Sequence, residues 1–242
     1  MNRDKQPYLS IVIPVYNEER RVKNLTQIIP YLKKQKYSWE VIVVNDGSTD
    51  KTETKLEQLK KKLKFEVISY IENRGKGVAV KSGMLKAVGK YRLFLDIDLS
   101  TPINEFDKFL PQIKKYDIVI GSRKMRGSNV VIRQHVIREV LGRIFTFLSQ
   151  KVLGVNISDF TCGFKCFSGK AAEEIFSKQT INGWGFDSEI LYIGKSKRKS
   201  IKEMAVEWKN DPRTRVKFPN AIIYSLLELI KIKINSYRGL YK

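Results

Sequence analysis

The first half of this 242-residue chain alternates short, almost continuous apolar runs with longer polar segments of helical periodicity. Runs this apolar are typical of strands that are buried on both faces of a sheet. The runs are residues 8–14, 40–45, 65–71, 91–96 and 117–121, and the helical segments between the first four are residues 18–34, 51–62 and 77–89. This alternation predicts an α/β fold with a mostly parallel central sheet and helices on both faces.

The pattern changes after Ser122. Apolar residues at intervals of three and four predict amphipathic helices over residues 137–153 and 220–234. Between them, residues 161–168 favour a strand and residues 188–195 a helix. We find neither an internal repeat nor a linker rich in Gly, Pro or Ser, so we expect one domain that spans residues 1–242.

The chain carries 46 Lys and Arg against 25 Asp and Glu, a formal net charge of +21. This excess indicates an anionic partner, such as nucleic acid, a membrane surface or a phosphorylated substrate. Nucleic acid is the least favoured, because no RNA- or DNA-binding motif is present and the basic residues are scattered. Cys162, Cys166 and His135 are too few for a disulfide framework or a typical zinc site.

The composition also bears on location. The longest apolar runs are too short for a helix that spans a bilayer, and the first residues lack the apolar stretch of a signal peptide. With two cysteines, a reducing environment is the simplest expectation. We therefore expect a cytoplasmic protein without a transmembrane helix or signal peptide.

Polar residues follow each predicted strand, where ligands bind in parallel α/β sheets. Asp96 and Asp98 are one residue apart, so in an extended chain both carboxylates face the same way and favour Mg2+ or Mn2+. Asp46 is suited to accept hydrogen bonds from a base or ribose, and Arg74 with Lys76 is suited to a diphosphate. Neither a P-loop motif nor the dinucleotide-binding glycine pattern occurs, so those two classes of site are excluded.

Four of these segments together resemble the family-two inverting glycosyltransferases, which have a GT-A fold; the segments are residues 14–19, 45–50, 73–77 and 96–98. Residues 121–123, 159–165 and 185–189 are similar to the branch of dolichyl-phosphate glucosyltransferases and dolichyl-phosphate mannose synthases. The Q-x-x-R-W motif of processive polysaccharide synthases is absent. The resemblance covers nearly the whole chain and depends on the series of motifs.

The resemblance implies that residues 1–121 bind a nucleotide sugar, with UDP-glucose favoured over GDP-mannose. The residues that would surround the nucleotide are Pro14, Tyr16, Glu18 and Asp46. Arg74 and Lys76 would lie near the donor phosphates. Asp96 and Asp98 would hold Mg2+ or Mn2+.

Residues 122–242 would bind a polyprenyl phosphate acceptor, with its phosphate on Arg123 and Arg138, together with Arg133. Guanidinium suits this role because it stays charged and binds phosphate in a bidentate manner. Asp187 matches the position that is often assigned as general base. A phosphate monoester has a second pKa of about 6 and is already anionic near neutrality, so we expect Asp187 to position groups instead.

Attack on the anomeric carbon would then give a β-linked product from an α-linked donor. A family-two transferase with a soluble glycan acceptor is the main alternative. Because a polyprenyl acceptor lies in the bilayer, we expect docking on an anionic membrane surface through the two amphipathic helices, or on a membrane-anchoring partner. Alternatively, the apolar faces of both helices pack on the sheet.

Overall fold

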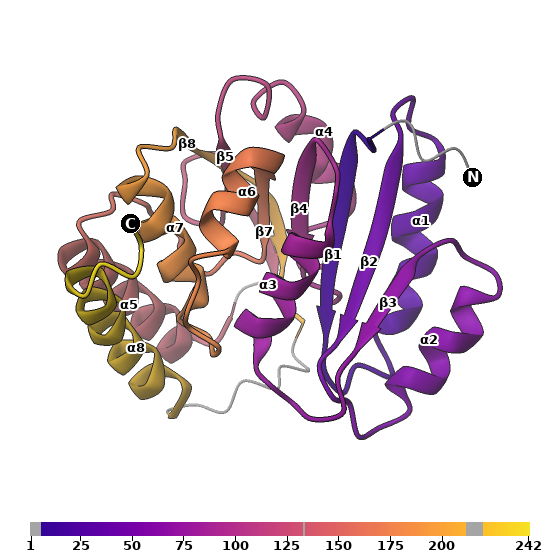
Figure 1. Cartoon of the computed structure of the whole chain (residues 1–242), viewed down its shortest axis with the longest axis horizontal. Coiled ribbons are helices and arrows are strands. Elements are labelled where there is room, and N and C mark those ends of the chain that lie inside the picture. The colour runs from indigo at the N-terminus through magenta and orange to yellow at the C-terminus, as the bar shows by residue number, and fades with distance from the viewer. Residues whose placement is uncertain (1–5, 133, 212–219) are drawn as a thin grey trace.

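The computed structural model describes residues 6–132, 134–211 and 220–242. Its centre is a seven-stranded sheet with the order β3-β2-β1-β4-β7-β5-β8 (Figure 1). These strands are β1 Leu9–Val15, β2 Trp39–Asn45, β3 Glu66–Ser69, β4 Tyr91–Leu95, β5 Ile118–Ser122, β7 Phe164–Ser168 and β8 Ile201–Ala205. The five strands expected in the first half are all present. A separate two-stranded sheet joins β6 (Asn129–Ile132) to β9 (Glu207–Lys209).

The sheet is mixed, because β7 runs antiparallel to both of its neighbours while the other pairs are parallel. The chain enters β7 at the carboxyl end of β4, where Leu95 pairs with Phe164. The turn that precedes β7 therefore lies at the same edge as the polar segments that follow β1, β2 and β4. This reversal, which the apolar pattern could not reveal, brings residues 159–163 to the predicted site.

Helices cover both faces of the sheet, as expected. On one face α1 (Leu25–Lys33), α2 (Thr52–Lys60) and α4 (Phe106–Phe109) bury alternate strand residues such as Ile11 and Val43. The other face carries α3 Lys76–Lys86, α5 Val136–Leu153, α6 Gly169–Phe176, α7 Phe186–Ser196 and α8 Asn220–Tyr237. There the strands contribute their intervening residues, such as Val12 and Phe94. A strand with both of its sides buried in this way explains the continuous apolar runs.

The segment expected to be helical from residue 18 begins later. Asn17 adopts a left-handed φ of 53°, and the chain then turns through Glu18 before a short 3-10 helix, η1 (Val22–Asn24). A second 3-10 turn, η2 (Ile103–Glu105), leads into α4. The turn at Asn17 and Glu18 leaves the end of β1 open for polar contacts rather than covering it with helix.

The two amphipathic helices, α5 and α8, pack side by side at the C-terminal side of the molecule (Figure 1). Each buries one face in the core, through Phe145 and Leu153 on α5 and Leu229 and Ile232 on α8. Each also leaves an apolar stripe exposed, so packing on the sheet accounts for only part of their apolar surface. Within the described residues, no helix is long and apolar enough to cross a membrane.

Candidate active site

Asp46, at the end of β2, organises the turn between β3 and α3. Its carboxylate accepts hydrogen bonds from Asn73 Nδ2 and from the main-chain N–H groups of Arg74 and Gly75, each at 2.9 Å. The residue is only 2% exposed. These bonds let Asp46 hold the turn, and its contact to a base or ribose stays a prediction.

Gly75 is required in this turn. Its φ is +101°, and a Cβ atom would lie 2.4 Å from the carbonyl oxygen of Asn182. This close approach lets residues 75–77 pack directly on residues 181–182, where Gly77 N donates to Asn182 O at 2.8 Å. The turn after β3 and the segment before α7 therefore form one unit.

Lys76 reaches from this turn to the end of β4 and forms an ion pair with Asp96, with 2.7 Å between Nζ and Oδ1. The ammonium also lies 5.3 Å from the ring centre of Trp184 and 5.9 Å from that of Phe186. Burial opposes the charge of Lys76, but Asp96 and then Asp187 raise its pKa. Two of the predicted donor-site residues, Lys76 and Asp96, are thus brought into contact.

Asp98 lies close enough to Asp96 for the two carboxylates to interact. Burial, and then the negative charge of Asp96, raise the pKa of Asp98. Asp98 Oδ1 accepts a hydrogen bond from Ser100 N at 2.9 Å, and a Cβ on Gly163 would lie 1.9 Å from Asp96 Oδ2. Two neighbouring, partly buried carboxylates after β4 suit the binding of a divalent cation, because the cation would offset their mutual repulsion.

The described residues hold no cluster of three or more His, Cys, Asp or Glu side chains that could bind a metal by themselves. Magnesium commonly binds through one or two carboxylates and completes its octahedron with water and substrate phosphates. The pair Asp96 and Asp98 therefore fits Mg2+ or Mn2+ in the presence of a diphosphate, rather than a metal caged by protein alone.

Asp187, in the first turn of α7, forms a buried ion pair with Lys165 of β7. Lys165 is fully buried, donates to Cys162 O at 2.7 Å and lies 5.1 Å from the ring centre of Phe94. Burial raises the pKa of Asp187, although Lys165 and Lys76 oppose this shift. A carboxylate fixed by a lysine in this way is suited to positioning substrate groups, and that role of Asp187 stays a prediction.

Arg123, just after β5, is held by Asp159. Nε and Nη2 donate to the two carboxylate oxygens at 2.7 Å, and Nη2 also donates to Thr161 Oγ1 at 2.8 Å. Burial opposes the charge of Arg123, but Asp159 outweighs it and raises the pKa; Arg123 in turn lowers the pKa of the buried Asp159. No bond of Nη1 is recorded among the described residues, so this nitrogen can face an anion.

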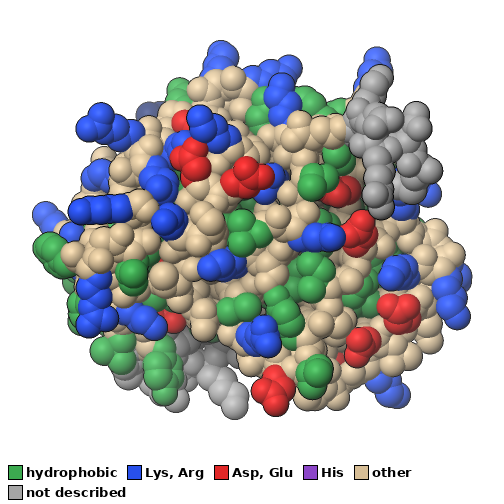
Figure 2. Space-filling model, viewed as in Figure 1, with side chains coloured by type: hydrophobic (Ala, Val, Ile, Leu, Met, Phe, Trp, Pro, Cys, Tyr) green, Lys and Arg blue, Asp and Glu red, His purple; other side chains and the backbone are tan. Residues whose placement is uncertain are grey.

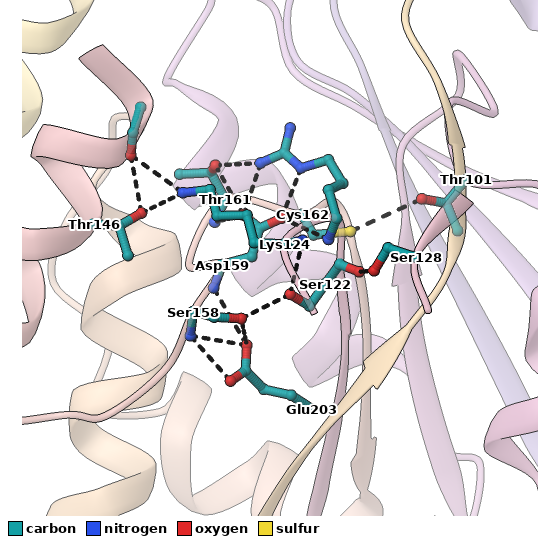
Figure 3. Close-up of polar contacts among 12 residues, drawn as sticks. Thr101, Ser122, Lys124, Ser128, Thr146, Ser158, Asp159, Thr161, Cys162 and Glu203 are labelled. Atoms are coloured by element: carbon teal, nitrogen blue, oxygen red, sulfur yellow. Dashed lines mark hydrogen bonds and ion pairs between the residues drawn. The ribbon is translucent and has the colours of Figure 1, made fainter. Parts of the chain in front are cut away.

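Glu203 of β8 supports this arrangement from below (Figure 3). Its carboxylate accepts from Ser158 N at 3.0 Å, from Ser158 Oγ at 2.8 Å and from Asp159 N at 3.2 Å. In the same view Lys124 reaches towards α5, where Nζ donates to Thr146 Oγ1 at 2.5 Å. Glu203 therefore fixes the turn that carries Asp159, and Lys124 joins the end of β5 to α5.

A surplus of positive charge surrounds this turn. Burial, and then Arg123, lower the pKa of Arg138 on α5. Burial lowers the pKa of Lys124 most, and Arg123 and Arg143 lower it further against the opposing pull of Asp159. Arg123 and Arg138, both expected at the acceptor phosphate, thus lie within electrostatic reach of each other. Arg133 lies outside the described residues.

The remaining predicted nucleotide residues surround the ends of β1 and β3. Pro14 is in β1 opposite Val44, and Tyr16 is 41% exposed. Glu18 pairs with Arg21 at 2.9 Å. The recorded side-chain contact of Arg74 is the ring of Tyr70, at 4.7 Å, rather than Asp96 or Asp98.

Sequence reasoning assigned no role to Lys165, Asp159, Glu203 or Glu228. The first two lie in the segment 159–165 that carried the family resemblance, so their motif was the available signal. Glu203 lies in a strand of mixed polarity that gave no signal. Cys162 and Cys166 are free and buried, so they pack as two small core residues.

Comparison with known proteins gives a consistent result. Residues 10–176 match the family model "Glycosyl transferase family 2". The chain is 34% identical to the dolichyl-phosphate β-glucosyltransferase of Saccharomyces cerevisiae over 262 residues, which cover 99% of this chain and 78% of that protein. It is 33% identical to dolichyl-phosphate β-glucosyltransferase ALG5D of Trichomonas vaginalis, over 95% of this chain and 74% of that protein.

Solved structures agree on the fold. Glucosyl-3-phosphoglycerate synthase from Mycobacterium tuberculosis, in complex with Mn2+, UDP and glucosyl-3-phosphoglycerate, superposes with a TM-score of 0.69 at 19% identity, over 95% of this chain and 79% of that chain. TarS of S. aureus with UDP-GlcNAc superposes with a TM-score of 0.58 at 20% identity, over 94% of this chain and 66% of that chain. At these identities the likeness concerns the fold alone, and it confirms the expected GT-A architecture.

Proposed function

The chain belongs to glycosyltransferase family 2, and from this premise we propose that it transfers glucose from UDP-glucose to a polyprenyl phosphate of the dolichyl type. The observation that carries the proposal is the pairing of two sites at one sheet edge. Asp96, Asp98 and Lys76 form an arrangement suited to a metal-bound diphosphate. Arg123 and Arg138 form a basic cluster suited to a phosphate acceptor.

On the donor side, Asp96 and Asp98 would hold Mg2+ or Mn2+. When bound, the ion would neutralise negative charge on the leaving diphosphate. The UDP complexes of glucosyl-3-phosphoglycerate synthase include Mn2+ and Mg2+, which supports a divalent ion here. The protein adds the ammonium of Lys76 and the turn ordered by Asp46, and Pro14, Tyr16, Glu18 and Arg74 would line the nucleotide side of the pocket.

On the acceptor side, we assign the phosphate to Arg123 and Arg138, with Lys124 as a third nearby cation. Burial lowers the pKa values of Arg138 and Lys124 most, and repulsion from Arg123 lowers them further; a dianionic phosphate would relieve that repulsion. Asp159 keeps the Arg123 guanidinium oriented while leaving Nη1 for the acceptor. The assignment of residues 1–121 to the donor and 122–242 to the acceptor is part of this proposal, with Asp187 of the second part reaching the sugar.

The chemical step is then an in-line displacement. A phosphate oxygen of the acceptor attacks the anomeric carbon of glucose, the bond from that carbon to the UDP oxygen breaks, and the configuration inverts. Since the attacking phosphate is already anionic near neutrality, no proton has to be removed by a base. Positioning of the two substrates and stabilisation of charge would dominate, with Asp187 orienting the sugar hydroxyls.

The proposal is tested by offering radiolabelled UDP-glucose and GDP-mannose in separate tubes, with Mg2+ and either a short polyprenyl phosphate or a soluble glycan. We expect label in the organic phase from UDP-glucose alone. Label from GDP-mannose would favour a polyprenyl-phosphate mannosyltransferase. Label only in the soluble glycan would contradict the lipid acceptor.

A polyprenyl phosphate acceptor lies in a bilayer, so the enzyme has to approach the membrane surface. The exposed surface of α5 and α8 is suited to this approach. Among the side chains of α5 and α8 that the structure describes, ten large apolar ones are exposed, and we call them the apolar stripe. The stripe consists of Val136, Ile137, Val140, Ile144, Phe147, Tyr224, Leu227, Ile230, Ile234 and Tyr237. Apolar and basic side chains are interspersed over these helices at the lower left of Figure 2. We assign this surface to reversible docking on anionic lipid.

Docking predicts that the protein floats with vesicles that contain anionic lipid. The double substitution Ile137→Asp and Leu227→Asp should lower binding at least about tenfold, because burial of each side chain is worth about 1.5–3 kcal/mol. Ile71→Asp is the matched control, since Ile71 is fully exposed beyond β3 at the opposite edge of the sheet. Absence of wild-type flotation would remove direct docking and leave a membrane-anchoring partner.

A further inference from the structure

Glu228 is the one acidic residue of α8, and it points inwards rather than to solvent. Its Oε2 accepts a hydrogen bond from Gly185 N at 2.7 Å. Burial raises the pKa of Glu228, while the main-chain N–H groups of Gly185 and Gly183 oppose this shift. A Cβ on Gly183 would lie 2.4 Å from Glu228 Oε1, and one on Gly185 would lie 2.7 Å from Glu228 Cβ. Glycine at positions 183 and 185 therefore leaves the room that the Glu228 side chain occupies.

The segment that Glu228 holds leads directly to the donor residues. Trp184 lies between the two glycines, and its ring faces the Lys76 ammonium at 5.3 Å. The preceding residue pair, 181–182, packs on Gly77, whose N–H donates to Asn182 O. Lys76 in turn contacts Asp96. Three successive contacts therefore link Glu228 to Asp96, a proposed metal ligand, although Glu228 belongs to the helix that carries half of the apolar stripe.

Glu228 also lies at the start of α7. Gly185 is the N-cap of that helix and makes no side-chain capping bond, so the Glu228 carboxylate satisfies an N–H group that the helix itself leaves free. Negative charge at a helix N-terminus is favourable. Asp187 lies in the first turn of the same helix. One carboxylate thus fixes both Trp184 and the start of the helix that carries Asp187.

We propose that Glu228 is a positioning residue that fixes residues 183–185 from α8, and so sets the placement of Trp184 and Lys76 around the donor diphosphate. The inference rests on the proposed function for the identity of the donor. The side chain of Glu228 thereby connects α8, which we assign to lipid docking, with the donor site. Glu228 does not itself touch the substrates.

The test compares Glu228→Gln with the matched control Glu57→Gln, an exposed glutamate on α2. The protein is labelled with 5-fluorotryptophan, which gives one resonance each for Trp39, Trp184 and Trp208. The resonance that disappears in Trp184→Phe is that of Trp184. We expect Glu228→Gln to shift or broaden the Trp184 resonance alone. We also expect it to weaken binding of UDP-glucose with Mn2+ about tenfold. The carboxylate accepts from the N–H groups of both Gly183 and Gly185, and the one amide oxygen of glutamine can replace only one of its two oxygens, so about one hydrogen bond to a charged group is lost.

Glu228→Asp keeps the charge but withdraws the carboxylate by one methylene, so it should cause the same two changes. It also carries the test if Glu228→Gln does not fold. An unmoved Trp184 resonance, or an affinity within twofold of wild type, would overturn the proposal. If the wild type does not bind UDP-glucose, the proposed donor is wrong, and the Trp184 resonance then decides by itself whether Glu228 positions the segment.

Discussion

Replacing Asp98 by asparagine is expected to lower the rate of glucose transfer by about 10³-fold while the fold stays intact. Charge stabilisation by a bound divalent ion is worth several kcal/mol, and each 1.4 kcal/mol corresponds to a tenfold change in rate. Asparagine keeps the oxygen that accepts from Ser100 N, so the local turn is preserved and only the charge is lost. The measurement is transfer into the organic phase at saturating donor and acceptor.

Asp107→Asn is the matched control. Asp107 is exposed, and its Oδ1 accepts from Tyr31 Oη on the face of the sheet that carries α1. The same chemical change should leave transfer within twofold of wild type. If Asp98→Asn retained more than about a tenth of the activity, the assignment of this carboxylate to the metal would be wrong.

The second large effect concerns stability. Lys165→Met is expected to lower the free energy of unfolding by about 3–5 kcal/mol, because it leaves the Asp187 carboxylate buried without its cation. Chemical denaturation measured by circular dichroism gives this value.

Loss of Lys165 also removes a cation that opposes the raised pKa of Asp187, so the variant should hold this group protonated at higher pH. Since the folded state then binds more protons than the unfolded state, stability should fall as pH rises above about 4.

A double variant separates the ion pair from its function. Lys165→Met with Asp187→Leu replaces two buried charges by apolar groups and should recover most of the lost stability. Transfer should stay low, since the carboxylate that orients the sugar is gone. If Lys165→Met lost less than about 1 kcal/mol, the ion pair with Lys165 would not be what stabilises the buried Asp187 carboxylate.

The sequence was most informative where local pattern decides the structure. β1, β2, β4 and β5 are buried on both sides, so their apolar runs marked them clearly. β8 was missed because Glu203 and its neighbours in the strand are only partly buried and of mixed polarity. β7 was expected as a strand, but its antiparallel direction depends on where the chain re-enters the sheet. That is a tertiary property without a local signature.

The candidate site also contains some residues that local pattern predicts and some contacts that depend on the tertiary fold. Asp96, Asp98 and Lys76 were predicted because strand ends in a parallel sheet converge at one edge. The ion pair of Arg123 with Asp159 joins residues 36 positions apart, and Glu228 acts on Gly185 across 43 positions. Such pairings depend on tertiary contact between distant segments. Asp46 was predicted at the site from its position after β2, but the hydrogen bonds of its carboxylate to the turn at residues 73–75 could be found only from coordinates.

The configuration of the product tests the central claim most directly. The protein would be incubated with UDP-glucose labelled with 13C at the anomeric carbon, a short polyprenyl phosphate and Mg2+, and the product examined by NMR. The account predicts a single lipid-linked glucosyl phosphate in the β configuration. An α-linked product, or free glucose as the only labelled product, would contradict direct displacement by the acceptor phosphate.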